Sequence, residues 1–387
     1  MGKHLNEPSS AHEKEFGIPP DLVTVVPQAA TLLGTFSDYI KGWSLGCNTA
    51  DGIVLTISGR DDNIVRVVNS TKQDKKKFSL SSIKYRREDK WANAVKAVFL
   101  ELGRNGVRCG GYSILITGRG CNASPYSLSA EIYAGLTVAL NELLSLGWDR
   151  RKLYSVALEA SHFSLQGAAR WRDLWLLLFA EEGKMYLFDE KTRGVKEAGF
   201  DVSPCRSLLF NSDIPYSVLT PEYDEFKAGL PELVLRFQSA IPKDTELRKL
   251  SDKEIRYYSS RFSERDRRYL LFLNLSSSSA RSAFDEIQKG NVKGFGTVLS
   301  NAQRSLVSNA ELTSPELDWI FRRSKENTSV IGMASIDVGI AGSLVTIVDE
   351  KSGFPNNQRV DEYERIFGFH PVASDFAPSS SVEIIGK

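Results

Sequence analysis

The sequence is poor in the two residue types that most often build disulfide frameworks and zinc sites. It contains 4 cysteines and 4 histidines in 387 residues. Cys47, Cys109, Cys121 and Cys205 are widely spaced and form no CxxC pair. Because such sites need paired cysteines or closely spaced ligands, the sequence favours neither.

The sequence also lacks an excess of either charge and a long apolar run. Lys and Arg total 49 against 48 for Asp and Glu, a formal net charge of +1. Nucleic-acid-binding proteins usually carry a basic surface, which this balance does not favour. The apolar run Leu174–Ala180 is too short to cross a bilayer, and residues 1–17 contain no apolar stretch typical of a signal peptide. We expect a cytoplasmic, monomeric globular protein without nucleic-acid or membrane partners.

Hydrophobic residues make up 42% of the chain and charged residues 25%, as in proteins that bury a large core. The length predicts about two or three domains. We expect an N-terminal arm over residues 1–21, a strand-rich domain over 22–200, and a second domain over 201–387 in which long helices dominate after Thr220.

Apolar periodicity predicts the main elements. Strands are expected at residues 22–26, 52–58, 63–69, 112–117, 184–189, 207–211, 329–333 and 343–349. Helices are expected at 91–102, 127–146, 151–163 and 173–180, and another begins at Ser314-Pro315. Gly59–Asp62 indicates a hairpin turn, Lys72–Lys77 a solvated turn, and Ser276–Ser279 a helix cap or turn.

Gly42 to Gly46 fit the G-x-S-x-G pattern of a hydrolase nucleophile elbow. That motif needs a strand before the serine and a helix after it. The residues after Cys47 have the pattern of a strand instead, and His4 and His12 fall in the expected arm. We therefore expect no Ser-His-Asp triad.

An ordered set of segments resembles galactokinase, a member of the GHMP small-molecule kinases, over roughly residues 25–375. The segments are Leu32–Tyr39, Cys121–Glu131, the helix opened by Asp173, Asn211-Ser212, Pro221-Glu222-Tyr223, and Arg304–Leu306 with Ser314–Asp318. The resemblance implies a two-domain α+β architecture with an interdomain cleft. It also implies ATP-dependent phosphorylation of galactose to galactose 1-phosphate, with ATP and Mg²⁺ as cofactors.

The first family motif, R-V-N-L-I-G-E-H-T-D-Y, corresponds to residues 29–39, where Gly34, Asp38 and Tyr39 match. Ala29 stands where the family has an arginine at the reacting centre, and Thr35-Phe36 replace the Glu-His pair that helps hold sugar. The S-E-Y motif, whose tyrosine contacts sugar, corresponds to Pro221–Tyr223. The resemblance therefore assigns substrate contacts to Thr35, Phe36, Ser37, Asp38 and Tyr223.

The second motif, P-x-G-x-G-L-S-S-S-A, wraps ATP phosphates with backbone amides at a helix start, which requires glycine and free N–H groups. This chain has Asn122–Tyr126 there, and Pro125 has no amide hydrogen. The resemblance assigns Ser127 and Glu159 as ligands of Mg²⁺. It also assigns Ser127 as a residue that binds the ATP cofactor.

The family's catalytic aspartate opens a helix, and Asp173 matches it. Its neighbours Arg170 and Arg172 allow a second interpretation, in which Asp173 forms a structural salt bridge. Both interpretations stay open at the level of sequence.

The third motif, T-G-G-G-F-G-G, corresponds to Ala334–Ile340, which has a single glycine and places Asp337 near an anionic ligand. One such repulsion at ~4 Å costs about 4 kcal/mol at an effective dielectric of about 20. Both phosphate loops are thus degraded independently.

Three hypotheses follow from these departures. The first is a galactokinase homologue, a pseudoenzyme, whose activity is absent or strongly reduced and which retains sugar or partner binding. The second is an active sugar kinase with a rebuilt phosphate site that uses Arg119, Arg170 and Arg172. The third is an interaction module that binds neither nucleotide nor sugar.

Overall fold

The computed structural model describes residues 3–118, 125–163, 169–214, 216–339 and 342–386. It divides into two compact units. Unit 1 comprises Met1–Ala29, Asn48–Glu182 and Pro378–Lys387, and unit 2 comprises Ala30–Cys47 and Gly183–Ala377. Each unit combines strands and helices, which confirms the expected α+β class. The domain limits expected at residues 21 and 200 stay a prediction.

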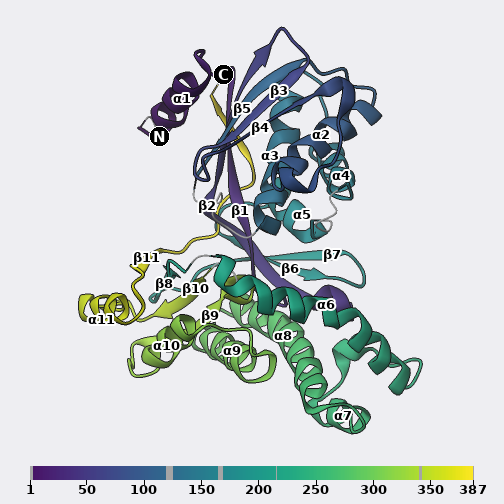
Figure 1. Cartoon of the computed structure of the whole chain (residues 1–387). Helices are drawn as coiled ribbons and strands as arrows, with labels where there is room; N and C mark the ends of the chain where they lie inside the picture. The colour runs from purple at the N-terminus through teal and green to yellow at the C-terminus, as the bar shows by residue number, and fades with distance from the viewer. Residues whose placement is uncertain (1–2, 119–124, 164–168, 215, 340–341, 387) are drawn as a thin grey trace. The chain divides into compact units, whose positions relative to one another are not determined.

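Unit 1 contains a sheet in the order β12-β1-β2-β5-β3-β4 (Figure 1). The strands are β1 (Leu22–Leu33), β2 (Trp43–Arg60), β3 (Ile64–Asn69), β4 (Asp74–Ser79), β5 (Gly111–Thr117) and β12 (Glu383–Gly386), and the ends of β1 and β2 continue into unit 2. The expected hairpin between β2 and β3 is wrong. β5 lies between them, antiparallel to β2 and parallel to β3. Its side chains are nearly all buried, which suits a central strand.

The expected solvated turn at Lys72–Lys77 is also wrong. Only the first residues of this run form a turn, and Asp74–Ser79 form β4, which pairs with β3. Within the described residues β4 has no second neighbour, so it is an edge strand. Charged side chains on an edge strand discourage pairing with another chain, which accounts for lysines in a β-strand.

Four helices pack beside this sheet in unit 1 (Figure 1). They are α2 (Ala92–Arg104), α3 (Pro125–Leu143), α4 (Arg150–Ser161) and α5 (Trp171–Phe179), close to the predicted ranges. The side chain of Asp149 caps α4 by accepting a hydrogen bond from the Lys152 amide. The apolar periodicity therefore located these helices correctly.

The segment expected as an arm contains a helix, α1 (Lys3–Phe16). His12 of this helix is fully buried in unit 1. Its two ring nitrogens lie 2.8 Å from the Thr56 hydroxyl and 2.9 Å from the Ser58 hydroxyl, both on β2. These two contacts join α1 to the sheet.

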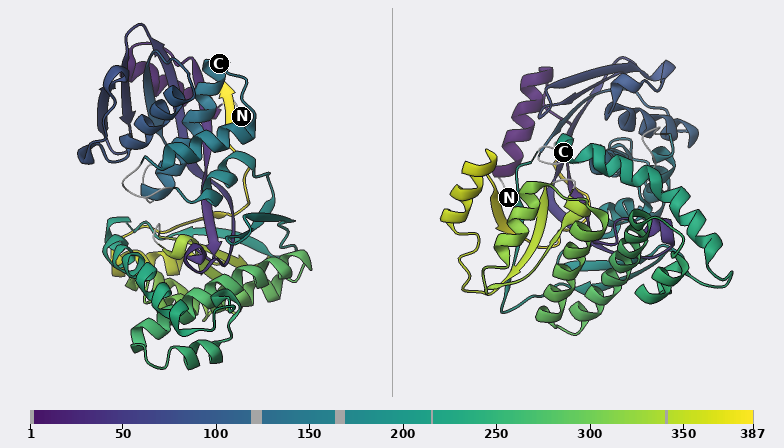
Figure 2. Two further views of the ribbon diagram at one scale, coloured as in Figure 1. Left: turned by 90° about the vertical axis from the view of Figure 1, so that its right-hand side faces the viewer. Right: turned by 60° about the horizontal axis from the view of Figure 1, so that its bottom comes forward.

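Unit 2 contains an antiparallel sheet in the order β11-β8-β10-β9 and a pair, β6-β7, in which β6 also pairs with Trp43–Gly46 of β2 (Figure 1). Figure 2 shows the same chain in two further views. The strands are β6 (Lys184–Asp189), β7 (Gly194–Gly199), β8 (Arg206–Asn211), β9 (Val330–Ser335), β10 (Ser343–Val348) and β11 (Val372–Asp375). Ser44 of the G-x-S-x-G pattern is fully buried inside β2, so the pattern forms no nucleophile elbow.

Six helices of unit 2 are described: α6 (Tyr216–Ala240), α7 (Asp252–Tyr258), α8 (Glu264–Gln288), α9 (Val292–Ser305), α10 (Pro315–Ser324) and α11 (Asn357–Phe367). The predicted start of α10 is confirmed, because Ser314 caps it and Pro315 is its first residue. Phe284 of α8 and Phe295 of α9 pack with Val345 of β10 in one buried cluster. No helix in the described part of the chain is long and apolar enough to cross a membrane.

Candidate functional site

Residues 30–39 of the segment that corresponds to the first family motif lie in unit 2, and Ala29 is the last residue of unit 1 before them. The segment comprises the end of β1, the turn at residues 34–36 and most of a short 3-10 turn, η1 (Ser37–Ile40). Gly34 has a positive φ of +79°, and a Cβ at this position would lie 2.2 Å from the Trp43 carbonyl oxygen. Only glycine fits such a close approach. The motif glycine is therefore required by the fold itself.

Four of the five predicted substrate-binding residues are buried. The exposed fractions are 4% for Thr35, 4% for Phe36, 2% for Ser37 and 9% for Tyr223, whereas Asp38 is exposed. The structure thus brings Phe36 and Tyr223 together in unit 2, but it packs them into the core. Their proposed role in sugar binding stays a prediction.

Phe36 is the centre of an aromatic cluster. Its ring centroid lies 5.5 Å from that of Tyr223, 5.0 Å from Phe226 and 6.4 Å from Phe272. Phe226 and Phe272 are each 2% exposed. Aromatic rings at these separations contribute favourable edge and stacking contacts in addition to area burial. The cluster fills the space beside η1 with side chains of this chain.

Two serines of the Ser276–Ser279 run hold this segment from helix α8. The Ser276 hydroxyl accepts a hydrogen bond of 3.1 Å from the Gly34 amide, and the Ser277 hydroxyl accepts one of 2.7 Å from the Trp43 amide. The expected cap or turn is wrong, because the run lies inside α8. The serine run is conspicuous in the sequence. Its role as an acceptor of backbone hydrogen bonds, however, depends on a tertiary contact that the sequence pattern does not predict.

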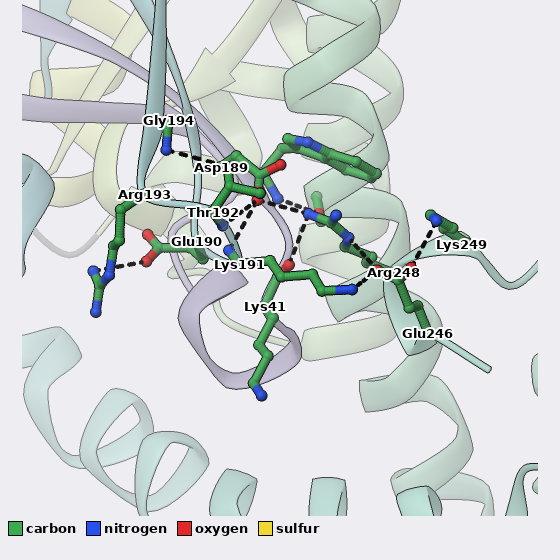
Figure 3. Close-up of polar contacts among 12 residues, drawn as sticks. Lys41, Asp189, Glu190, Lys191, Thr192, Arg193, Gly194, Glu246, Arg248 and Lys249 are labelled. Atoms are coloured by element: carbon green, nitrogen blue, oxygen red, sulfur yellow. Dashed lines mark hydrogen bonds and ion pairs between the residues drawn. The ribbon is translucent and has the colours of Figure 1, made fainter. Parts of the chain in front are cut away.

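A polar network around Arg248 contacts the chain just after η1 (Figure 3). The Arg248 guanidinium donates to Asp189 Oδ1 at 2.7 Å, to Glu246 Oε2 at 3.0 Å and to the Lys41 carbonyl at 3.0 Å. It also lies 4.3 Å from the Trp43 ring centroid. Hydrogen bonds from Lys249 and Lys191 lower the pKa of Glu246 to about 2. Arg248 therefore joins three segments of unit 2, and sequence reasoning missed it.

The segment corresponding to the third family motif follows β9. Asp337 has φ 45° and Val338 φ 55°, both in the left-handed region. A β-branched residue rarely adopts this conformation, whereas glycine adopts it freely. The backbone thus has a conformation suited to glycine, although this chain has Asp and Val there. Asp337 is only 7% exposed.

In unit 1, α3 begins at Pro125, and the loop Asn122–Ser124 lies outside the described residues. Ser127, the predicted cofactor and metal ligand, is 8% exposed. One turn further along α3, Glu131 is fully buried, and neither of its carboxyl oxygens has a hydrogen-bond partner in the described structure. Burial raises the pKa of Glu131 well above its usual value, because a buried carboxylate loses the hydration that stabilises its charge.

The predicted Mg²⁺ ligands Ser127 and Glu159 differ in their surroundings. The Glu159 carboxylate is 58% exposed and lies 3.6 Å from His162 Nδ1, whereas Ser127 is buried. Among the described residues no three His, Cys, Asp or Glu side chains are grouped as a metal site. The assignment of Mg²⁺ to Ser127 and Glu159 stays a prediction.

Asp173, the predicted catalytic residue, lies in the first turn of α5 and is 4% exposed. Arg170 Nε donates to Asp173 Oδ2 at 2.7 Å. Arg172 is 1% exposed. The ion pair with Arg170 is the contact that the structural interpretation of Asp173 expected.

Comparison with known proteins gives full-length similarity at low identity. No protein-family model matches the chain. A Treponema pallidum protein with a provisional galactokinase name is 24% identical over 395 residues, covering 100% of this chain and 98% of that protein. The galactokinase of Thermococcus kodakarensis is 25% identical over 363 residues, covering 93% and 99%. The structure of Lactococcus lactis galactokinase complexed with galactose has a TM-score of 0.85 at 20% identity, covering 98% and 99%.

Proposed function

We propose that this chain, which belongs to the galactokinase family of GHMP small-molecule kinases, has lost or strongly reduced the transfer of phosphate from ATP to galactose. The observation that carries the proposal is the packing of Phe36. Galactose needs polar side chains that reach its hydroxyl groups, because a polar group buried without partners costs free energy. Here Phe36 packs against Tyr223, at 5.5 Å between centroids, and against two further phenylalanines.

The third-motif segment supports the same conclusion for the phosphate end. Phosphoryl transfer depends on positioning and on the stabilisation of negative charge. Asp337 adds a carboxylate where the family has glycine, and Pro125 at the start of α3 cannot donate a backbone hydrogen bond. Both differences weaken the binding of an anionic ligand.

The position of the missing arginine supports the proposal as well. Ala29 lies in β1 and is 3% exposed. An arginine introduced there has to bury its charge or distort its surroundings, and burying an unpaired charge is costly. We therefore expect Ala29→Arg alone to restore no activity.

An active kinase with a rebuilt phosphate site is the alternative. Of the three arginines that it requires, Arg170 is paired with Asp173 and Arg172 is 1% exposed. Arg119 lies outside the described residues. The pairing of Arg170 and the burial of Arg172 argue against their use as charge donors to ATP.

A coupled ADP-release assay with galactose tests the proposal on wild type, on Ala29→Arg and on a variant that also restores the family residues at 122–126 and 335–338. A galactokinase serves as the positive control. We expect no turnover above background from wild type or Ala29→Arg. Turnover by either protein comparable to that of the control contradicts the proposal.

Nucleotide binding is measured separately by thermal unfolding with millimolar ATP and Mg²⁺. A ligand at about 100 times its dissociation constant adds about 2.7 kcal/mol to stability. We expect no magnesium-dependent rise in the melting temperature. A clear rise favours the active-kinase alternative.

A further inference from the structure

A small pocket inside unit 2 lies between the first-motif and third-motif segments. It is lined by uncharged residues from β1, α8, α9 and β9 and from the turns that follow them, among them Gly34, Ser276, Gln303, Ser335 and Val338. None of these side chains is charged. The pocket lies wholly within unit 2.

Gln303 contributes a hydrogen-bond donor to this pocket. Its Oε1 accepts a hydrogen bond of 2.8 Å from the Ser335 amide, which fixes the orientation of the side-chain amide. Its Nε2, on the same carboxamide group, is buried without a hydrogen-bond partner among the described residues. Gln303 is 2% exposed, so bulk water does not compensate this donor.

Ser335 contributes a second polar group. Its hydroxyl is also buried without a partner in the part of the chain that the structure describes, and the residue is 5% exposed. A further polar group of the pocket, the Gly34 amide, already donates to the Ser276 hydroxyl. Two unsatisfied groups, one a donor and one able to donate and accept, thus line one pocket.

The size of the pocket limits the guest to one small group. It offers about 20 Å³ for the centre of a water-sized sphere. About 10–15 Å³ by this measure is enough for one water, which needs two to four polar partners. The uncharged lining and the nearby Asp337 disfavour an anion.

We propose that this pocket binds one hydroxyl oxygen, either of a water molecule or of a short uncharged polyol, through Gln303 Nε2 and Ser335 Oγ. The guest links α9 to the third-motif segment. A phosphate-binding segment of the family thus becomes, in this chain, a subsite for a neutral hydroxyl. The proposal concerns unit 2 alone and does not depend on the loss of kinase activity.

Ser335→Ala tests the site against a matched control, Ser44→Ala. Ser44 is a second buried serine in unit 2 whose hydroxyl has no partner among the described residues, and it does not line the pocket. Removing an unsatisfied buried hydroxyl is neutral or stabilising, whereas removing a partner of a bound guest is destabilising. We expect Ser335→Ala to lower the melting temperature of the full chain and Ser44→Ala to leave it unchanged or raise it. If neither Ser335→Ala nor Ser44→Ala lowers the melting temperature, the proposal is overturned.

A crystal structure and a ligand titration distinguish the two sources of the hydroxyl. Without polyol, we expect a density peak within hydrogen-bond distance of both Gln303 Nε2 and Ser335 Oγ. If erythritol raises the melting temperature of wild type more than that of Ser335→Ala, the guest is a polyol hydroxyl. If erythritol changes the melting temperatures of wild type and Ser335→Ala equally and the density peak is present, the guest is water. No peak, or stabilisation of wild type by inorganic phosphate that Ser335→Ala abolishes, overturns the proposal.

Discussion

At the scale of single residues, Asp173, which the resemblance predicts as the catalytic aspartate, is buried and takes part in an ion pair. Asp173 is 4% exposed and accepts a hydrogen bond from Arg170 Nε at 2.7 Å. A buried carboxylate beside an arginine is held in place by charge-assisted hydrogen bonding. The contact occupies one of the two carboxyl oxygens, Oδ2.

Asp173→Asn tests this assignment. The substitution keeps the shape but removes the charge that faces Arg170, so we expect it to lower the free energy of unfolding by about 1–3 kcal/mol. Urea denaturation measures the change. Glu197→Gln, which removes the partner of Lys184 in an exposed ion pair, is the control and should change stability by less than about 1 kcal/mol. If Asp173→Asn has unchanged stability and instead weakens galactose binding, Asp173 contacts sugar.

At the scale of elements, Arg248 connects parts of unit 2 that lie far apart in the sequence. It donates to the end of β6 at Asp189, to Glu246 before the 3-10 turn Leu247–Lys249, and to the carbonyl of Lys41 after η1 (Figure 3). Burial opposes the ionisation of Asp189, but hydrogen bonds from the Lys191 amide and from Arg248 outweigh it and lower the pKa of Asp189. Arg248 itself is 8% exposed.

Arg248→Ala removes all of these contacts at once. We expect it to lower the free energy of unfolding by about 3 kcal/mol and to speed amide hydrogen exchange around η1, because it leaves Asp189 partly buried without its arginine. Arg236→Ala is the matched control, since Arg236 is 49% exposed and pairs with Asp266. Its effect should stay within about 1 kcal/mol. Equal effects of the two variants contradict the role given to Arg248.

At the scale of the whole molecule, two buried groups in unit 1 make stability depend on pH in opposite directions. Burial lowers the pKa of His12 from 6.5 to about 4, so the unfolded chain binds a proton that the folded chain does not bind between these values. His12 therefore makes stability fall as pH decreases from 6.5 towards 4. Burial raises the pKa of Glu131 above 4.5, so the folded chain keeps a proton that the unfolded chain loses. Glu131 therefore makes stability fall as pH rises above 4.5.

Single substitutions separate the two effects. We expect Glu131→Gln to gain stability relative to wild type by about 1.4 kcal/mol per pH unit above pH 4.5, up to the pKa of the folded state. We expect His12→Gln to lose less stability than wild type when the pH falls from about 6.5 to about 5. Urea denaturation at several pH values measures both. Parallel profiles of wild type and Glu131→Gln contradict a buried neutral acid.

Elements with local signals could be predicted from the amino-acid sequence alone. The helix of Ser314-Pro315 begins where its cap residues indicate, and β6 occupies residues 184–189 as its apolar pattern predicts. The same patterns carried the resemblance to the galactokinases, because spacing and order survive even where motif residues change. These features depend on side-chain periodicity and on hydrogen bonds between near neighbours, and both can be predicted from the amino-acid sequence.

Contacts between segments that are distant in the sequence could not be predicted in this way. β5 lies between β2 and β3 in the sheet, although β2 and β3 are neighbours in sequence and have a turn between them. Ser276 and Ser277 bind the backbone near Gly34 and Trp43 from within α8. The burial of Phe36 depends on three aromatic rings that lie about 190 to 240 residues further along the chain. Such contacts are chosen by burial and packing of the whole core, which no local pattern encodes.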